Sequence, residues 1–199
     1  EQRQLFRNYL ENQRQYIQRY GIDSTLVVFT DLSSTQQLPL HQVTDYRRGA
    51  DIYWSCQTTE QRQALCVLLP MTTLMEAKQF IERVKAIYNA VAGKAVIRLD
   101  ANQGWTAKEA VYALHKLEDA GVRLELVEQP VKYYDLEGLK YITERVHTPV
   151  MADESSFGPR EVIELIKMRA ADIINIKLMK TGGISNAIKI AEICSFYDM

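Results

Sequence analysis

The sequence is poor in cysteine and histidine, and this scarcity argues against a protein stabilised by disulfides and against one stabilised by zinc. Its 199 residues contain three cysteines, Cys56, Cys66 and Cys194, with no CxxC pair and no neighbouring histidine cluster. An odd number of cysteines at unrelated spacings indicates neither a disulfide framework nor a zinc site. The composition fits a reducing, cytoplasmic location.

The chain also lacks long apolar runs and a leader-like start. No stretch approaches the roughly 18 uninterrupted apolar residues of a spanning helix, so we expect no transmembrane segment. The opening EQRQLFRNYL does not resemble a signal peptide. Because there is no initiator methionine, we expect the chain to begin inside a longer protein.

No charge of one sign dominates. Lysine and arginine number 24 against 25 aspartate and glutamate residues, which gives a formal net charge of -1. Without an overall field, neither a nucleic acid polymer nor an anionic membrane surface is expected as a partner. Hydrophobic residues make up 47% of the chain, enough for one large domain or two small ones.

The first half reads as a helix, three strands and a second helix. Residues 1–20 carry apolar side chains near helical spacing, and Gly21 stands where that helix would end. Runs dense in β-branched and aromatic residues predict strands at 24–32, 51–54 and 64–69, the last ended by Pro70. One long amphipathic helix is predicted over 71–92.

The second half alternates strands with helices. Strands are predicted at 95–100 (AVIRLD), 124–129 (LELVEQ), 149–154 (PVMADE) and 173–178 (IINIKL), with helices beginning near 106, 134, 158 and 185. This rhythm indicates parallel βαβ units. The expected fold class is therefore α/β, with about four βα units of a partial TIM barrel in this half.

Three acids stand at the C-terminal ends of predicted strands: Asp100, Glu128 and Asp153. Parallel strands in a barrel bring these ends to one rim, where uncompensated carboxylates would repel one another. A single acid at a strand end is more often a helix cap or a solvated residue. Three together are most simply explained by a divalent cation, and Mg²⁺ is the expected cofactor.

Lys177 ends the fourth predicted strand, within reach of a substrate bound at such a cation. A lysine in this place can move a proton to or from a carbon next to a carboxylate.

The strings RLDANQGW, VEQP, ADES and NIKLMKTGG resemble the muconate-lactonizing branch of the enolase superfamily, especially its L-Ala-D/L-Glu dipeptide epimerases. The resemblance implies that Asp100, Glu128 and Asp153 are Mg²⁺ ligands and that Lys177 is the acid/base lysine of barrel strand six. It also implies a dipeptide substrate and a Mg²⁺-dependent racemase or epimerase reaction through an enediolate, in which two lysines act on opposite faces of the α-carbon.

The chain departs from that family in two respects. Where the family has a KxK motif at the end of barrel strand two, this sequence reads LLPMTT, without lysine. We also expect the capping domain and barrel strands one, two, seven and eight to be missing. We therefore expect a metal site but an incomplete two-base mechanism.

A different pattern lies in the first half, where RRGADIYW contains an RxxD motif at Arg48 and Asp51. With the following ALCVLLP and TTLMEAKQFIERV, it resembles the degenerate GGDEF domain of the cyclic-di-GMP receptor of Pel polysaccharide secretion. The resemblance implies that Arg48, Asp51 and Arg83 bind cyclic-di-GMP. Residues 57–61, QTTEQ, replace the GGDEF signature, so cyclase activity is excluded and binding without turnover is the alternative function.

The two resemblances meet near residues 83–92, which indicates a fusion or chimera. We assign residues 1–85 to a degenerate GGDEF-like segment and 86–199 to an enolase-superfamily half-barrel. Four open parallel strands expose their edges, so the halves cover one another or the chain forms a homo-oligomer.

Overall fold

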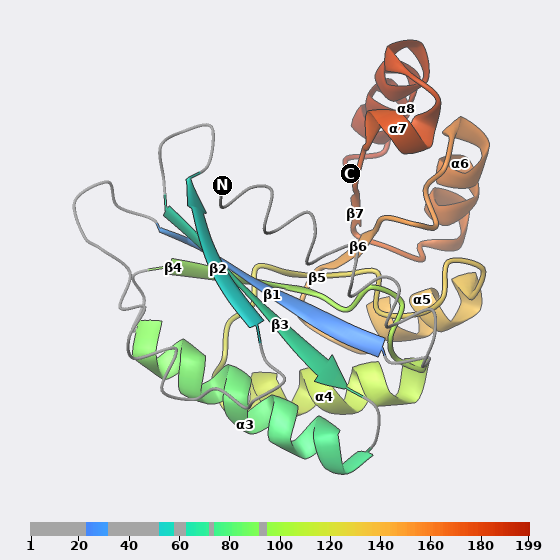
Figure 1. Ribbon diagram of the computed structural model, residues 1–199. Coiled ribbons are helices and arrows are strands. Elements are labelled where there is room, and N and C mark those ends of the chain that lie inside the picture. Colours follow the sequence, from blue (N-terminus) through green and yellow to red (C-terminus); the bar gives the residue numbers. More distant parts are fainter. Residues whose placement is uncertain (1–22, 32–51, 58–62, 72–73, 92–94) are drawn as a thin grey trace.

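The protein has an α/β fold built on a single seven-stranded sheet of order β2-β3-β1-β4-β5-β6-β7 (Figure 1). The structure, a computed structural model, describes residues 23–31, 52–57, 63–71, 74–91 and 95–199, with side chains from residue 77 onward. The sheet changes character at β4 (Ala95–Asp100), which is antiparallel to β1 on one side and parallel to β5 on the other.

The antiparallel part contains β1 (Asp23–Asp31), β2 (Ile52–Gln57) and β3 (Gln63–Met71). Helix α3 (Leu74–Val91) leads from β3 to β4. Both of these strands are antiparallel to β1, which lies between them, so β3, α3 and β4 form a split βαβ unit.

Proline 70 does not end its strand, and the prediction that it would was wrong. β3 continues to Met71, with Pro70 opposite Ser24 of β1. The pairing of β3 with β2 stops at Leu68. At Pro70, β3 is therefore paired with β1 on one side and with no described strand on the other. Sheets accept proline at such an edge position.

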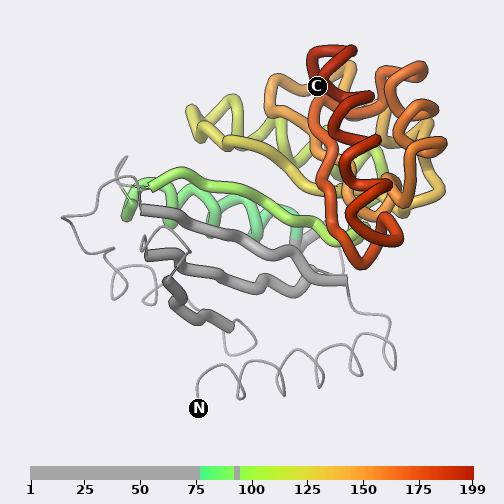
Figure 2. Tube along the Cα trace, turned by 90° about the horizontal axis from the view of Figure 1, so that it is seen from above, coloured from blue at the N-terminus to red at the C-terminus, as the bar shows by residue number. Residues whose placement is uncertain are grey.

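The parallel part confirms the predicted alternation of four strands with helices. After β4 its strands are β5 (Leu126–Glu128), β6 (Val150–Ala152) and β7 (Ile173–Ile174); its helices are α4 (Ala107–Asp119), α5 (Leu136–Thr143), α6 (Pro159–Met168), α7 (Leu178–Thr181) and α8 (Ile184–Phe196). Figure 2 shows α6 to α8, orange to red, gathered at one end of the molecule, away from α3.

Local sequence explains how these elements form and pack. The Thr106 side chain accepts from the Glu109 backbone N–H while the Glu109 carboxylate accepts from Thr106, a capping box that starts α4. In β4, Ile97 and Leu99 are buried and Arg98 between them is exposed, as the two-residue period of a strand requires. The buried faces of α3, β4, α4, β5, α5 and β6 share one hydrophobic core.

A second, smaller hydrophobic cluster fastens the C-terminal helix. It consists of Val162 from α6 with Ile190 and Cys194 from α8. Several apolar side chains of α7 and α8 remain exposed, among them Leu178, Met179, Ile184, Ile188 and Phe196. Of the helices described, none combines the length and apolar character needed to cross a membrane.

The Glu118 carboxylate ties the end of α4 to the segment that enters β6. Its Oε1 accepts from the backbone N–H groups of His147 and Thr148, at 2.9 and 2.8 Å, and from the Thr148 hydroxyl at 2.8 Å. This contact fixes how β6, which ends just before Asp153, is presented to the sheet.

We expect Glu118→Ala to lower the free energy of unfolding by about 2 kcal/mol, because two backbone donors and a hydroxyl lose a charged acceptor. Urea denaturation followed by circular dichroism measures the change. Glu164→Ala, at an exposed position of α6, is the matched control and should change stability by less than about 0.5 kcal/mol. Equal effects of the two substitutions would contradict this assignment.

Candidate functional site

The three predicted acids lie at the same end of three neighbouring parallel strands. Asp100 ends β4 and is the register partner of Glu128, which ends β5. Glu128 is in turn paired with Met151 of β6, and Asp153 follows the last residue of that strand. The register therefore places carboxylates from three strands at one rim.

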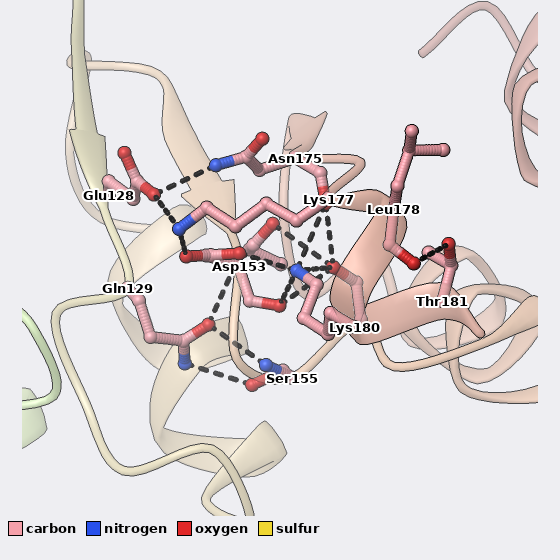
Figure 3. A network of polar contacts seen from close by, with 11 residues as sticks. Glu128, Gln129, Asp153, Ser155, Asn175, Lys177, Leu178, Lys180 and Thr181 are labelled. Atoms are coloured by element: carbon pink, nitrogen blue, oxygen red, sulfur yellow. Dashed lines mark hydrogen bonds and ion pairs between the residues drawn. The ribbon is translucent and has the colours of Figure 1, made fainter. Parts of the chain in front are cut away.

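Lys177 does not lie in a strand, so the strand predicted over 173–178 is present but shorter than predicted. β7 ends at Ile174 and Lys177 is the extended residue before α7. The Lys177 carbonyl accepts from the backbone N–H groups of Lys180 and Thr181, which turns the chain into the helix. The Lys177 ammonium nevertheless reaches the rim: it donates to Oδ2 of Asp153 and lies 3.6 Å from Oε1 of Glu128 (Figure 3).

Lys180 is a second cation at the site, which the sequence reasoning missed. Its ammonium donates to Oδ1 and to the carbonyl oxygen of Asp153, to Oγ of Ser156 at 3.0 Å and to the Asn175 carbonyl at 3.1 Å. The signal was present in NIKLMKTGG, because residues three apart in a helical turn point to the same side.

Gln129 is a fully buried polar residue that joins the ends of β5 and β6. Its Oε1 accepts from the backbone N–H groups of Asp153, at 2.9 Å, and Ser155, at 3.2 Å. Its Nε2 donates to the Val131 carbonyl and to Oγ of Ser155. Its backbone has a φ of 36°, in the left-handed region, and these bonds offset the cost of that conformation.

Asn175 orients the middle carboxylate. Its Nδ2 donates to Oε1 of Glu128 at 2.9 Å, the same oxygen that Lys177 approaches. Its backbone N–H donates to the Ala152 carbonyl, so the contact follows directly from the pairing of β6 with β7. Neither Asn175 nor Gln129 was predicted, although both lie within the recognised strings.

The surroundings of the first two carboxylates disfavour their charged forms. Burial, together with the charge of Glu128, raises the pKa of Asp100 from 3.8 to about 7, against one hydrogen bond from the Asn102 backbone N–H. Burial and the Asp153 carboxylate also raise the pKa of Glu128, although the Asn175 hydrogen bond acts in the opposite direction.

Asp153 has the opposite balance. Burial would raise its pKa, but the hydrogen bonds and charges of Lys177 and Lys180 outweigh burial and lower it. Burial would lower the pKa of Lys177, yet its hydrogen bond to Asp153 and the nearby acids raise it, so the Lys177 side chain is an ammonium at neutral pH.

The donor set suits a hard divalent cation. Carboxylate oxygens are preferred Mg²⁺ ligands. Burial, with a smaller effect of neighbouring carboxylates, raises the pKa values of Asp100 and Glu128, so a bound cation would favour their charged forms. The neighbouring Glu154 has a buried Oε2 without a hydrogen-bond partner among the described residues. In the described part of the chain no three acid, histidine or cysteine side chains are arranged as a finished metal site. The Asp153 carboxylate is paired with the Lys177 and Lys180 ammonium groups.

The other predicted site is described only at Arg83, a half-buried residue of α3. Arg48 and Asp51 lie outside the described residues, so the structure does not test their expected grouping with Arg83.

Two protein families match the chain, in overlapping parts. Residues 60–199 match the family described as Enolase C-terminal domain-like, and residues 3–111 match the PelD GGDEF domain. The overlap includes α3 and β4.

Curated relatives match the C-terminal part. The L-Ala-D/L-Glu epimerase of Bacillus subtilis is 56% identical over 117 residues, and the hydrophobic dipeptide epimerase of Enterococcus faecalis is 57% identical over 114 residues. Each match covers 57% of this chain and 32% of the relative. The chain thus spans about a third of the length of the curated relatives it matches.

Solved structures agree. A substrate-liganded L-Ala-D/L-Glu epimerase from B. subtilis is 52% identical with a TM-score of 0.60, covering 61% of this chain and 34% of that one. The E. faecalis dipeptide epimerase complexed with Mg and L-Leu-L-Tyr is 53% identical with a TM-score of 0.59, covering 62% and 34%. The C-terminal part is homologous to dipeptide epimerases of the enolase superfamily.

The raised pKa of Asp100 gives a pH-dependent stability. The folded state holds a proton that the unfolded state has released, so this stabilising contribution is lost as pH rises from about 4 through about 7. With EDTA present, we expect the free energy of unfolding to fall from pH 5 to pH 8 more steeply in the wild type than in Asp100→Asn, the limiting slope for one proton being about 1.4 kcal/mol per pH unit. Denaturant titrations at both pH values measure it; identical slopes would refute the assignment.

Proposed function

Because the chain belongs to the Enolase C-terminal domain-like family through residues 60–199 and to the PelD GGDEF domain family through residues 3–111, we propose that its C-terminal part exchanges the proton on a carbon next to a carboxylate, with Mg²⁺ as cofactor and a dipeptide as substrate. The observation that carries this proposal is the convergence of three strand-end acids with the Lys177 ammonium.

Asp100, Glu128 and Asp153 would hold the cation. Mg²⁺ bound there would neutralise a substrate carboxylate and stabilise the negative charge that develops when the adjacent C–H bond loses its proton. Gln129 and Asn175 support this arrangement, because they fix the backbone of Asp153 and the carboxylate of Glu128.

Lys177 would transfer the proton. Its side chain is 46% exposed, so the amine can leave Asp153 and turn toward a substrate at the rim. A lysine gives up a proton more readily when neighbouring negative charge is neutralised, and this side chain lies between two such carboxylates.

The opposite face of the substrate has no assigned base. The position of the family's second lysine falls on LLPMTT, at the end of β3, and β1 separates β3 from β4. We therefore expect exchange with solvent without inversion, since one base returns a proton to the face from which it removed one.

Incubation of L-Ala-L-Glu with Mg²⁺ in D₂O tests this proposal. We expect proton NMR to show loss of the α-proton of the glutamate residue, while chiral chromatography shows no accumulation of L-Ala-D-Glu. Lys177→Ala should slow exchange by at least about 100-fold, the usual contribution of a general base.

Lys189→Ala is the matched control, because Lys189 is an exposed lysine of α8, and it should exchange like the wild type. Absence of exchange by the wild type would refute the proposed function, and accumulation of the epimer would refute the single-base mechanism.

The match to the PelD GGDEF domain favours a second function for the N-terminal part, namely binding of cyclic-di-GMP without turnover. Arg48 would contact a guanine edge or a phosphate, the Asp51 carboxylate would accept from guanine N–H groups, and Arg83 of α3 would complete the site. On this proposal the boundary between the two parts lies near residues 85–86, within α3.

Isothermal titration calorimetry with cyclic-di-GMP tests the second function. We expect Arg48→Ala to weaken binding at least about tenfold through loss of charged hydrogen bonds. Arg160→Ala, an exposed arginine of α6, should bind like the wild type. Absence of a heat of binding with the wild type, or equal affinity of Arg48→Ala and Arg160→Ala, would exclude this second function.

A further inference from the structure

The two lysines of the site differ in how firmly they are held. The Lys177 side chain is 46% exposed and approaches two carboxylate oxygens, whereas the Lys180 side chain is 8% exposed and reaches four oxygens. An ammonium has three hydrogens, so each donor of Lys180 has an acceptor and none is left for a substrate. Lys180 therefore contributes to the arrangement of the site rather than to proton transfer.

The contacts of Lys180 fix one proposed ligand directly and a second one through a neighbour. It holds Oδ1 and the carbonyl oxygen of Asp153, which restrains both the side chain and the backbone of that residue. It also holds the Asn175 carbonyl at 3.1 Å, and the Asn175 amide donates to Glu128.

The two oxygens of the Asp153 carboxylate are bound by different lysines. Lys180 occupies Oδ1 from a buried position, while Lys177 occupies Oδ2 from a half-exposed one. Only Oδ2 can be released by movement of an exposed side chain. We infer that Lys180 is a positioning residue that holds Oδ1 of Asp153, so that Oδ2 is the oxygen presented to a divalent cation; this inference rests on the proposed function.

Whether a substitution tightens or weakens cation binding distinguishes a purely electrostatic role of the lysine from a positioning role. Removing an ammonium beside a cation site tightens cation binding if Coulomb repulsion alone operates. Loss of a residue that orients a metal ligand weakens binding, typically by 10–100-fold. Lys180→Met and Lys177→Met remove the same charge from the same carboxylate, so each is the control for the other.

The experiment measures Mn²⁺ affinity by electron paramagnetic resonance of the free ion, with Mn²⁺ replacing Mg²⁺ at a carboxylate site. We expect Lys180→Met to weaken binding at least about tenfold, and Lys177→Met to bind at least as tightly as the wild type because a competitor for Oδ2 is gone. Lys180→Gln, which keeps a donor without the charge, should bind more tightly than Lys180→Met.

Circular dichroism establishes whether each variant is folded. If Lys180→Met does not fold, the inference is decided by comparing the Mn²⁺ affinity of Lys180→Gln with that of the wild type. Unchanged or tighter binding by the folded Lys180 variants, or equal weakening by Lys177→Met, overturns the inference and leaves the proposed function intact. Absence of Mn²⁺ binding by the wild type overturns the proposed metal function, and this inference with it.

Discussion

The structure depends on β4 being paired along both edges. Its antiparallel pairing with β1 joins it to the first three strands, and its parallel pairing with β5 begins the βα series. An unpaired edge of a parallel strand is an exposed row of donors and acceptors, and β1 removes it. The same strand also sets the register of the site, because Asp100 is fixed opposite Leu26 on one side and Glu128 on the other.

Charge balance at the rim follows from that register. Strand ends that meet side by side crowd Asp100, Glu128 and Asp153. The Lys177 and Lys180 ammonium groups outweigh burial at Asp153, whereas the charge of Lys177 does not outweigh burial at Asp100 and Glu128. The uneven compensation explains why the three carboxylates have pKa shifts in different directions.

Periodicity predicted the parts of the fold that local sequence decides. The strand at 95–100 and the start of α4 after Thr106 agree with the structure because alternation and a capping box are encoded within a few residues. β7 was predicted too long because IINIKL is rich in isoleucine and leucine, while the turn at Lys177 depends on its carbonyl accepting from Lys180 and Thr181. Asp100, Glu128 and Asp153 were identifiable as acids at strand ends. The spacing of Lys177 and Lys180 indicated that both lie on one side of a turn, but the contacts of Lys180 and Asn175 with distant residues are not revealed by spacing.

The acids and the lysines of the site are attached to different hydrophobic clusters. Asp100 and Glu128 end strands anchored in the large cluster, and Asp153 directly follows such a strand. Lys177 precedes α7 and Lys180 lies in it, and α7 leads to α8, which the cluster of Val162, Ile190 and Cys194 secures. Fewer buried contacts mean a lower free energy of local opening. Amide hydrogens of α7 and α8 would then exchange before those of α3 to α5, and each such opening would withdraw both cations from the acids while the rest of the molecule stayed folded.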